Sequence, residues 1–179
     1  MFKINEIFYS IQGEGYHAGT PAVFVRFSGC NLRCSFCDTQ HESGHLMPTE
    51  AILAQALQYP SKHLVLTGGE PSLYITEPFV EAFKERGFYV QIETNGTCPL
   101  PENLDWVTCS PKEQLLLQRA DELKVIFTGQ DLSIYNGFAC SYRALQPCSN
   151  QNIEEVVAYV LQHPEWHLSV QLHKWLHIA

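Results

Sequence analysis

Short apolar runs alternate with amphipathic stretches along most of the chain. Runs rich in β-branched and aromatic residues predict strands, and stretches whose apolar residues recur every three to four positions predict helices. We expect helices at 49–58, 77–86 and 152–162, with Thr49 and Thr76 capping the first two. The predicted strands are 1–10, 22–27, 63–67, 89–94, 106–109, 122–127, 141–145 and 167–172.

Strands that alternate with helices predict right-handed βαβ units and a parallel sheet, which places the chain in the α/β class. The alternation weakens late in the chain. Residues 113–120 can form a short helix at most, and no convincing crossover helix separates the strands at 122–127 and 141–145. Residues 173–179 are expected to form a tail. At 179 residues, without an internal repeat or linker, 1–179 is expected to form one domain.

Polar motifs follow the ends of several predicted strands. Ligands of parallel sheets bind beyond the carboxyl ends of the strands, so we expect one site where these motifs meet. The motifs are Gly68-Gly69-Glu70, Glu93-Thr94-Asn95, Ser110-Pro111-Lys112 and Gln146-Pro147, together with a cysteine-containing loop at 30–37.

Cys30, Cys34 and Cys37 are close enough in sequence for one loop to wrap their thiols around a single metal centre. Thiolates are soft ligands, so the candidate centres are zinc, copper(I) and an iron–sulfur cluster. Structural zinc nearly always has four protein ligands, whereas three ligands suit a 4Fe–4S cluster that keeps one iron open. The alternatives are a zinc site completed by a distant ligand such as His41, and three buried thiols without a shared role.

Charge and composition narrow the possible partners. A net charge of −8 without a lysine or arginine run argues against a nucleic-acid partner. No apolar run reaches membrane-spanning length, and residues 1–11 lack the features of a secretory signal, so no membrane association is expected. Seven cysteines cannot all pair, which favours a reducing, cytoplasmic compartment. The cysteines outside the loop are interpreted as small, partly buried residues: Cys98, Cys109, Cys140 and Cys148.

The Cys-x-x-x-Cys-x-x-Cys spacing, with Phe36 before the last cysteine, resembles the radical S-adenosylmethionine (SAM) enzymes. Motifs along essentially the whole chain occur in the same order in the 7-carboxy-7-deazaguanine synthases, so the chain resembles that family. Those motifs are Gln12-Gly13-Glu14-Gly15, Arg26, 30–39, 67–71, 92–97, Ser110-Pro111-Lys112, Gln146-Pro147 and 171–174.

The resemblance implies a partial parallel β/α barrel of the radical SAM type, incomplete and with reduced helix content. It implies a 4Fe–4S cluster, SAM and Mg²⁺ as cofactors. The implied reaction converts 6-carboxy-5,6,7,8-tetrahydropterin to 7-carboxy-7-deazaguanine through a 5′-deoxyadenosyl radical. Ammonia is released, and the product leads to queuosine and related deazapurines. A homodimer and an external one-electron donor such as flavodoxin are also implied.

The resemblance also assigns site residues. Cys30, Cys34 and Cys37 would hold the cluster, and Thr39 would contact Mg²⁺. Arg26 is the one charge in its strand, and its guanidinium suits the substrate carboxylate. The residues implied for SAM are Phe36, Asp38, Gly69, Glu70, Ser110, Pro111, Lys112, Gln146, Pro147, Cys148 and Ser149. Those implied for the pterin are Ile11, Gln12, Gly13, Glu14, Arg26, Thr67, His173 and Ala179.

Two other functions compete with this interpretation. Another radical SAM enzyme, such as a glycyl-radical activase, would share the cysteine loop and the strand-end glycines, but not the combination of 12–15, Arg26 and His173. A non-enzymatic zinc module would use the cysteines structurally. An iron–sulfur protein is brown, whereas d¹⁰ zinc is colourless, so colour and iron content separate a radical SAM enzyme from a zinc module.

Overall fold

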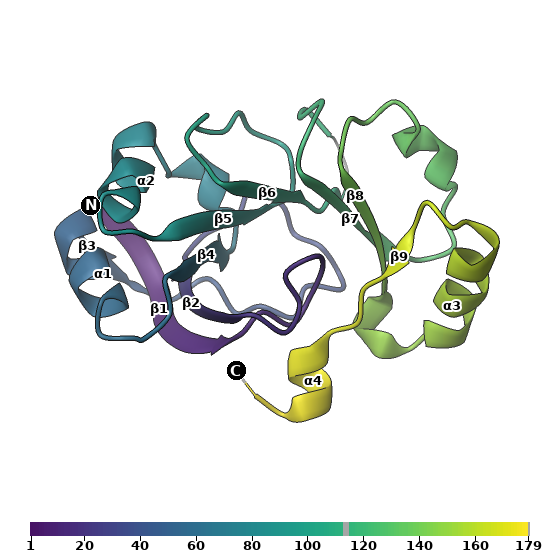
Figure 1. Cartoon of the computed structure of the whole chain (residues 1–179), viewed down its shortest axis with the longest axis horizontal. Helices are drawn as coiled ribbons and strands as arrows, with labels where there is room; N and C mark the ends of the chain where they lie inside the picture. Colours follow the sequence, from purple (N-terminus) through teal and green to yellow (C-terminus); the bar gives the residue numbers. More distant parts are fainter. Residues whose placement is uncertain (113–114, 179) are drawn as a thin grey trace.

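One curved sheet runs through the molecule (Figure 1). The computed structural model describes residues 1–112 and 115–178, and within these residues nine strands form a single sheet in the order β3-β1-β2-β4-β5-β6-β7-β8-β9. β1 is antiparallel to both its neighbours, whereas all neighbouring pairs from β2 to β9 are parallel. The strands are β1 (Phe2–Ile11), β2 (Pro21–Phe27), β3 (His45–Met47), β4 (His63–Gly68), β5 (Tyr89–Thr94), β6 (Trp106–Cys109), β7 (Glu122–Phe127), β8 (Tyr142–Pro147) and β9 (His167–Leu168).

The sheet is not closed into a full barrel. Its outer strands, β3 and β9, do not pair with each other in the part of the chain that the structure describes. The predicted partial parallel barrel is therefore confirmed, with an antiparallel pair of strands added at one edge.

Helices pack on the outer face of this sheet in two groups (Figure 1). α1 (Thr49–Ala56) and α2 (Glu77–Lys84) cover the end of the sheet near β1 to β5, and α3 (Ile153–Gln162) covers β8 and β9. The described helices are completed by α4 (Leu172–Leu176) and by the short 3-10 turns η1 (Pro71–Leu73), η2 (Leu132–Tyr135) and η3 (Cys148–Asn150).

Alternation along the strands separates an apolar outer face from an inner face that carries the charged residues of the sheet beside a small apolar cluster of Ala22, Phe24 and Val65. In β2, Val23, Val25 and Phe27 belong to the core beneath α1 and α2, whereas Arg26 lies on the opposite face. β7 repeats the pattern. Its outward residues, Leu123, Val125 and Phe127, join the second core beneath α3. Its inward residues include two charges, Glu122 and Lys124, followed by Ile126.

The loop between β1 and β2 fills the inner side of the sheet. Backbone bonds from Gln12 N to Thr20 O and from Gly19 N to Gln12 O, both 2.8 Å, close its neck. Beyond Glu14 the loop packs against residues at the amino ends of the parallel strands. Tyr16 stacks on Trp106, with ring centroids 4.7 Å apart, and His17 lies 4.8 Å from the ring of His63. This aromatic packing fixes the loop at one end of the sheet and turns Glu14 toward the other.

Several predicted boundaries were wrong. The cap of α1 is Pro48, and Thr49 is the first helical residue. The predicted cap of α2 at Thr76 is confirmed, although Thr76 makes no side-chain cap hydrogen bond. The strand expected at 167–172 ends at Leu168. Ser169 N still donates to Leu145 O of β8, but Leu172 N already donates to Gly13 O in the loop after β1. The expected tail contains α4, and β3 was not expected, since three residues carry too little periodicity. Residues 115–120 are not helical, and residues 113–114 of that predicted helix lie outside the described part.

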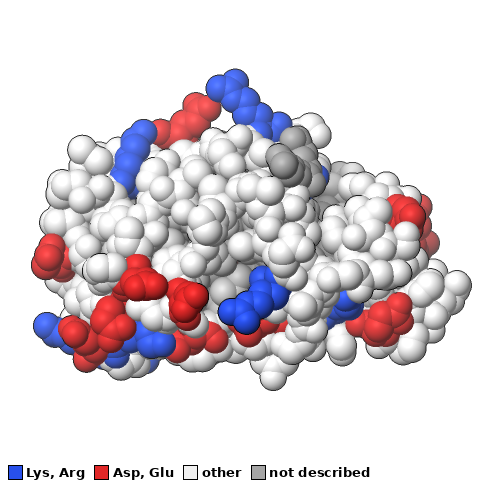
Figure 2. Space-filling model, turned by 90° about the horizontal axis from the view of Figure 1, so that it is seen from above, with Lys and Arg blue, Asp and Glu red and all other residues white. Residues whose placement is uncertain are grey.

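Acidic and basic side chains are interspersed around a broad uncharged centre on the face in Figure 2. Among the described residues, no helix has the length and apolar character needed to cross a membrane.

Candidate functional site

A cavity of about 820 Å³ lies at the carboxyl ends of the parallel strands, where the polar motifs were expected to meet. Two of the predicted site residues do not take part in its described lining. Pro111 is buried outside the lining, and Ala179 lies outside the described residues. The predicted residues that line it are Ile11, Gln12, Gly13, Glu14, Arg26, Cys30, Cys34, Phe36, Cys37, Asp38, Thr39, Thr67, Gly69, Glu70, Ser110, Lys112, Gln146, Pro147, Cys148, Ser149 and His173.

The cysteine loop forms one wall of this cavity. Cys37 N donates to Cys34 O at 3.1 Å, which makes a tight turn between the second and third cysteines. All seven cysteines of the chain are thiols, not disulfides. No group of three or more His, Cys, Asp or Glu side chains in residues 1–112 and 115–178 is arranged to hold a metal ion.

The donor set of the loop nevertheless fits a cluster. Three thiols open onto one cavity, and burial raises the pKa of Cys30, with further increases from the charges of Glu70, Cys34 and Cys37. Such mutual repulsion among neighbouring thiolates is relieved when a metal centre binds them, because metal coordination stabilises the thiolate form.

The backbone of the Gly68-Gly69-Glu70 segment packs tightly against the residue that precedes the cysteine loop. Glu70 N donates to Gly29 O at 2.9 Å, and Gly69 approaches that same carbonyl so closely that a Cβ at 69 would collide with it. A side chain at this position would therefore displace the residue that precedes Cys30.

Glu70 itself has a structural role in this state. Its carboxylate is almost fully buried and accepts hydrogen bonds from Ser72 N at 3.0 Å, Thr94 Oγ1 at 2.7 Å and Asn95 N at 2.7 Å. The resemblance assigns Glu70 to SAM binding, and in this structure its carboxylate joins the loops after β4 and β5.

Residues expected to bind SAM lie around the cysteine loop. Lys112 Nζ donates to Ser110 Oγ at 2.7 Å and lies 5.8 Å from the centre of the Phe36 ring. Burial lowers the pKa of Lys112. Lys174, from α4, pairs with Asp38 at 2.6 Å and so connects the C-terminal helix to the cysteine loop.

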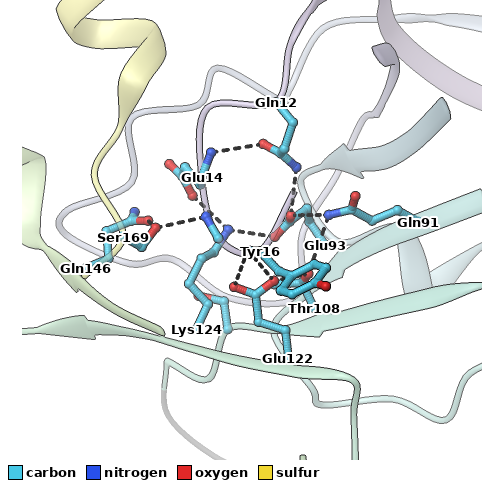
Figure 3. Close-up of polar contacts among 12 residues, drawn as sticks. Gln12, Glu14, Tyr16, Gln91, Glu93, Thr108, Glu122, Lys124, Gln146 and Ser169 are labelled. Carbon is cyan, nitrogen blue, oxygen red and sulfur yellow. Dashed lines mark hydrogen bonds and ion pairs between the residues drawn. The ribbon is translucent and has the colours of Figure 1, made fainter. Parts of the chain in front are cut away.

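A second wall carries a buried group of charges (Figure 3). Lys124 Nζ donates to Glu14 Oε2 at 2.8 Å and to Glu93 Oε2 at 2.7 Å. Glu14 Oε1 also accepts from Gln171 Nε2 at 2.8 Å, and Glu93 Oε1 accepts from Gln12 Nε2 at 3.1 Å. The loop after β1 is thus tied directly to β5, β7 and the segment before α4.

The two carboxylates respond differently to this environment. Burial opposes ionisation of Glu14, but Lys124 and the Gln171 hydrogen bond outweigh it and lower the pKa of Glu14 to about 2. Burial raises the pKa of Glu93 to about 7, with Glu122 and Glu14 adding to the rise and Lys124 opposing it. Burial disfavours the ammonium of Lys124, but its carboxylate neighbours outweigh this and raise its pKa well above the usual range. The group therefore contains one firmly ionised carboxylate and one that titrates near neutrality.

A third wall contains Arg26 and Thr67, which are partners across β2 and β4. Arg26 Nε donates to Glu6 Oε1 at 2.7 Å, and its guanidinium lies 5.5 Å from the centre of the Phe8 ring. With 21% of its side chain exposed, Arg26 keeps a cationic face on the cavity. His173 packs against Gly13, since a Cβ at 13 would lie 2.5 Å from His173 Nδ1.

Sequence reasoning missed Lys124 and Glu6, and it noted Glu93, Gln171 and Lys174 only as parts of motifs, without a role of their own. A lysine within the apolar strand at 122–127 is the same kind of exception that drew attention to Arg26. That pattern was sufficient to find Lys124. Glu6 follows Asn5 in the first strand, so it offers no such contrast with its neighbours.

Comparison with known proteins assigns the family. A profile of the Radical SAM superfamily matches residues 24–107. A 7-carboxy-7-deazaguanine synthase of Bacteroides thetaiotaomicron is 58% identical over 180 residues, covering 99% of both chains. The chain belongs to the 7-carboxy-7-deazaguanine synthase family.

Other members of the family agree with this assignment. The synthase of Bradyrhizobium diazoefficiens is 38% identical over 208 residues and is covered to 99%. The crystal structure of QueE from Escherichia coli superimposes with a TM-score of 0.81 at 30% identity, covering 96% of this chain and 94% of that chain. Family membership makes the chain a radical SAM enzyme that uses a 4Fe–4S cluster and SAM, which decides against the zinc module.

Proposed function

We propose that the chain acts, as a single domain over 1–179, on 6-carboxy-5,6,7,8-tetrahydropterin and converts it to 7-carboxy-7-deazaguanine with release of ammonia. The observation that supports this substrate is that Gln12, Glu14 and Arg26 line the same cavity as the thiols of the cysteine loop. A carboxylate and an amide suit the N–H-rich edge of a pterin, and a guanidinium suits its carboxylate.

The bound cluster and SAM would supply a 5′-deoxyadenosyl radical, and the protein would supply position and shelter. Arg26 binds the substrate carboxylate, while Glu14 and Gln12 hold the opposite edge of the ring. The walls of the cavity keep water from the reacting carbon. His173 closes the pocket beside Gly13, and Ala179 is proposed to reach it.

Mg²⁺ and the assembly belong to the same proposal. The Thr39 hydroxyl is a hard oxygen ligand on the cavity wall, which suits Mg²⁺. Omission of Mg²⁺ and addition of a chelator should therefore lower turnover.

We also propose a homodimer, measurable by light scattering, and an external one-electron donor such as flavodoxin.

Anaerobic turnover tests the substrate. Reconstituted protein is supplied with SAM, a reductant, Mg²⁺ and 6-carboxytetrahydropterin, and the products are read by mass spectrometry. We expect a deazaguanine product without stoichiometric SAM consumption, and none from a Cys34→Ala variant. SAM cleavage with an unchanged pterin would keep the superfamily and reject the substrate.

A further inference from the structure

Lys124 is the centre of the buried charges on the second wall (Figure 3). Only 6% of its side chain is exposed, against 17% for Glu14 and 16% for Glu93. It lies on β7, 110 residues from Glu14 and 31 residues from Glu93 along the chain. A lysine this deeply buried needs paired carboxylates, because burial disfavours an isolated ammonium.

The contacts of Lys124 extend to both side chains proposed to hold the pterin edge. Glu14 is bound directly. Lys124 is connected to Gln12 through Glu93, whose Oε1 accepts a hydrogen bond from Gln12 Nε2 at 3.1 Å. At the other end of the same amide, Gln12 Oε1 accepts from Glu14 N at 3.3 Å. The amide of Gln12 is therefore fixed in one orientation between two members of the charge group.

Glu14 retains acceptor capacity within this arrangement. Each carboxylate oxygen has two lone pairs, and the structure assigns one donor to each, Lys124 to Oε2 and Gln171 to Oε1. A ligand with two adjacent N–H groups can use the remaining lone pairs, provided that the carboxylate stays ionised.

We propose that Lys124 is a positioning residue for the substrate: it holds Glu14 as a carboxylate and, through Glu93, orients the amide of Gln12. The ligand class that this pair selects is a heterocycle with adjacent N–H donors on one edge. The identity of that heterocycle as a pterin rests on the proposed function, whereas the dependence of Glu14 on Lys124 does not.

The test compares Lys124→Met with Lys124→Arg, which keeps the charge. In Lys124→Met we expect the KM for the pterin to rise about tenfold or more, with the KM for SAM changing less than about threefold. Lys124→Arg should recover most of the loss. A matched control is Lys84→Met, which removes an ion pair to Asp105 of 2.7 Å that lies outside the cavity and should leave the pterin KM unchanged.

Lys124→Met leaves two buried carboxylates without their cation, so this variant can unfold. The double variant Lys124→Met/Glu93→Gln removes one of those charges, so the role of Lys124 can still be tested if the single variant unfolds. Carbon NMR of labelled glutamate then measures the pKa of Glu14 directly, without turnover. We expect Glu14 to titrate at distinctly higher pH in the double variant than in the wild type, because its counter-ion is gone.

Three results distinguish the two proposals. A wild type that converts the pterin, together with an unchanged pterin KM in folded Lys124 variants, overturns the role of Lys124. A wild type that converts no pterin overturns the proposed function, and the Glu14 titration then decides the role of Lys124 alone. An unchanged Glu14 titration in the double variant rejects that role in either case.

Discussion

Arg26 on β2 and Lys124 on β7 are cations that line the same cavity, and each sits among apolar strand residues. The strands β4, β5 and β6 lie between them in the sheet. The partners of the two cations differ. Arg26 binds Glu6, half of whose side chain is exposed, whereas Lys124 binds two carboxylates that are mostly buried. Exposed ion pairs contribute little to stability and exchange readily, so Arg26 can turn from Glu6 to a ligand more easily than Lys124 can leave Glu14.

Arg26→Ala should therefore act on substrate binding rather than on the cluster. We expect the pterin KM to rise about 10- to 100-fold, because charge-assisted hydrogen bonds to the substrate carboxylate are lost. The iron content should be unchanged. Steady-state kinetics and iron analysis measure the two quantities. Unchanged pterin binding would remove the carboxylate role, and Glu6→Gln serves as the control for loss of the existing ion pair.

Glu93 should make stability depend on pH. Burial raises its pKa from 4.5 to about 7 on folding; Glu122 and Glu14 add to the rise and Lys124 opposes it. The folded state therefore binds more protons than the unfolded state between these pH values. Stability should then fall as pH rises through that window. In Glu93→Gln this fall is absent, and between pH 5 and 8 the variant should gain about 2 kcal/mol relative to the wild type.

Urea unfolding at several pH values measures this difference. A Glu85→Gln variant at the exposed end of α2 is the control and should follow the wild type. Parallel curves for Glu93→Gln and the wild type would mean that Glu93 titrates as an ordinary glutamate.

The loop between β1 and β2 depends on close contacts across the sheet. Gly15 has a φ of +67°, and a Cβ there would collide with the Glu122 carboxylate, which accepts from Tyr16 N at 3.2 Å. Gly19 in the same loop has a φ of +91° but has open space around its Cα. The two glycines therefore separate backbone strain from steric collision.

Gly19→Ala should lower the free energy of unfolding by about 1 kcal/mol, the strain of a left-handed alanine. Gly15→Ala adds the displacement of a buried carboxylate and should cost about 3 kcal/mol or more. Urea unfolding of both variants provides the comparison. Equal losses would show that Glu122 yields without cost.

The elements that sequence reasoning found are those with a long apolar period. β2, β4, β5 and β7 were predicted within one or two residues, and the position of the site followed from where they end. β3 and α4 were missed, because three and five residues are too few to show a period. The Lys124 contacts were missed for another reason: they join residues far apart in sequence, which only the fold brings together.

Contacts between segments near the two ends of the chain bridge the open side of the sheet. Leu172 N donates to Gly13 O at 2.9 Å, Gly15 N donates to Ser169 Oγ at 2.9 Å, and Lys174 pairs with Asp38. These contacts span the gap between the two edges of the sheet. They hold the substrate loop and the cysteine loop in one cavity.

Removal of residues 172–179 should break the Leu172–Gly13 and Lys174–Asp38 contacts of this bridge and remove His173, while leaving the Gly15–Ser169 contact and the apolar cores in place. We expect pterin turnover to fall about 100-fold or more, since misplaced binding groups lose most of their catalytic advantage. The midpoint of thermal unfolding should fall by only a few degrees, about 2–4 °C per kcal/mol lost. Trp175→Ser is the control, because Trp175 is 60% exposed and lies outside the cavity lining. Full turnover by the truncated chain would mean that the bridge is dispensable.

The long separations within the Glu14 contacts also determine when the site can form during synthesis. Glu14 meets Lys124 110 residues later and Gln171 157 residues later. A nascent chain emerges from the ribosome amino end first, so the cysteine loop and β1 to β5 can fold well before these partners exist. The substrate pocket is therefore completed only after the segment that carries Gln171 has emerged.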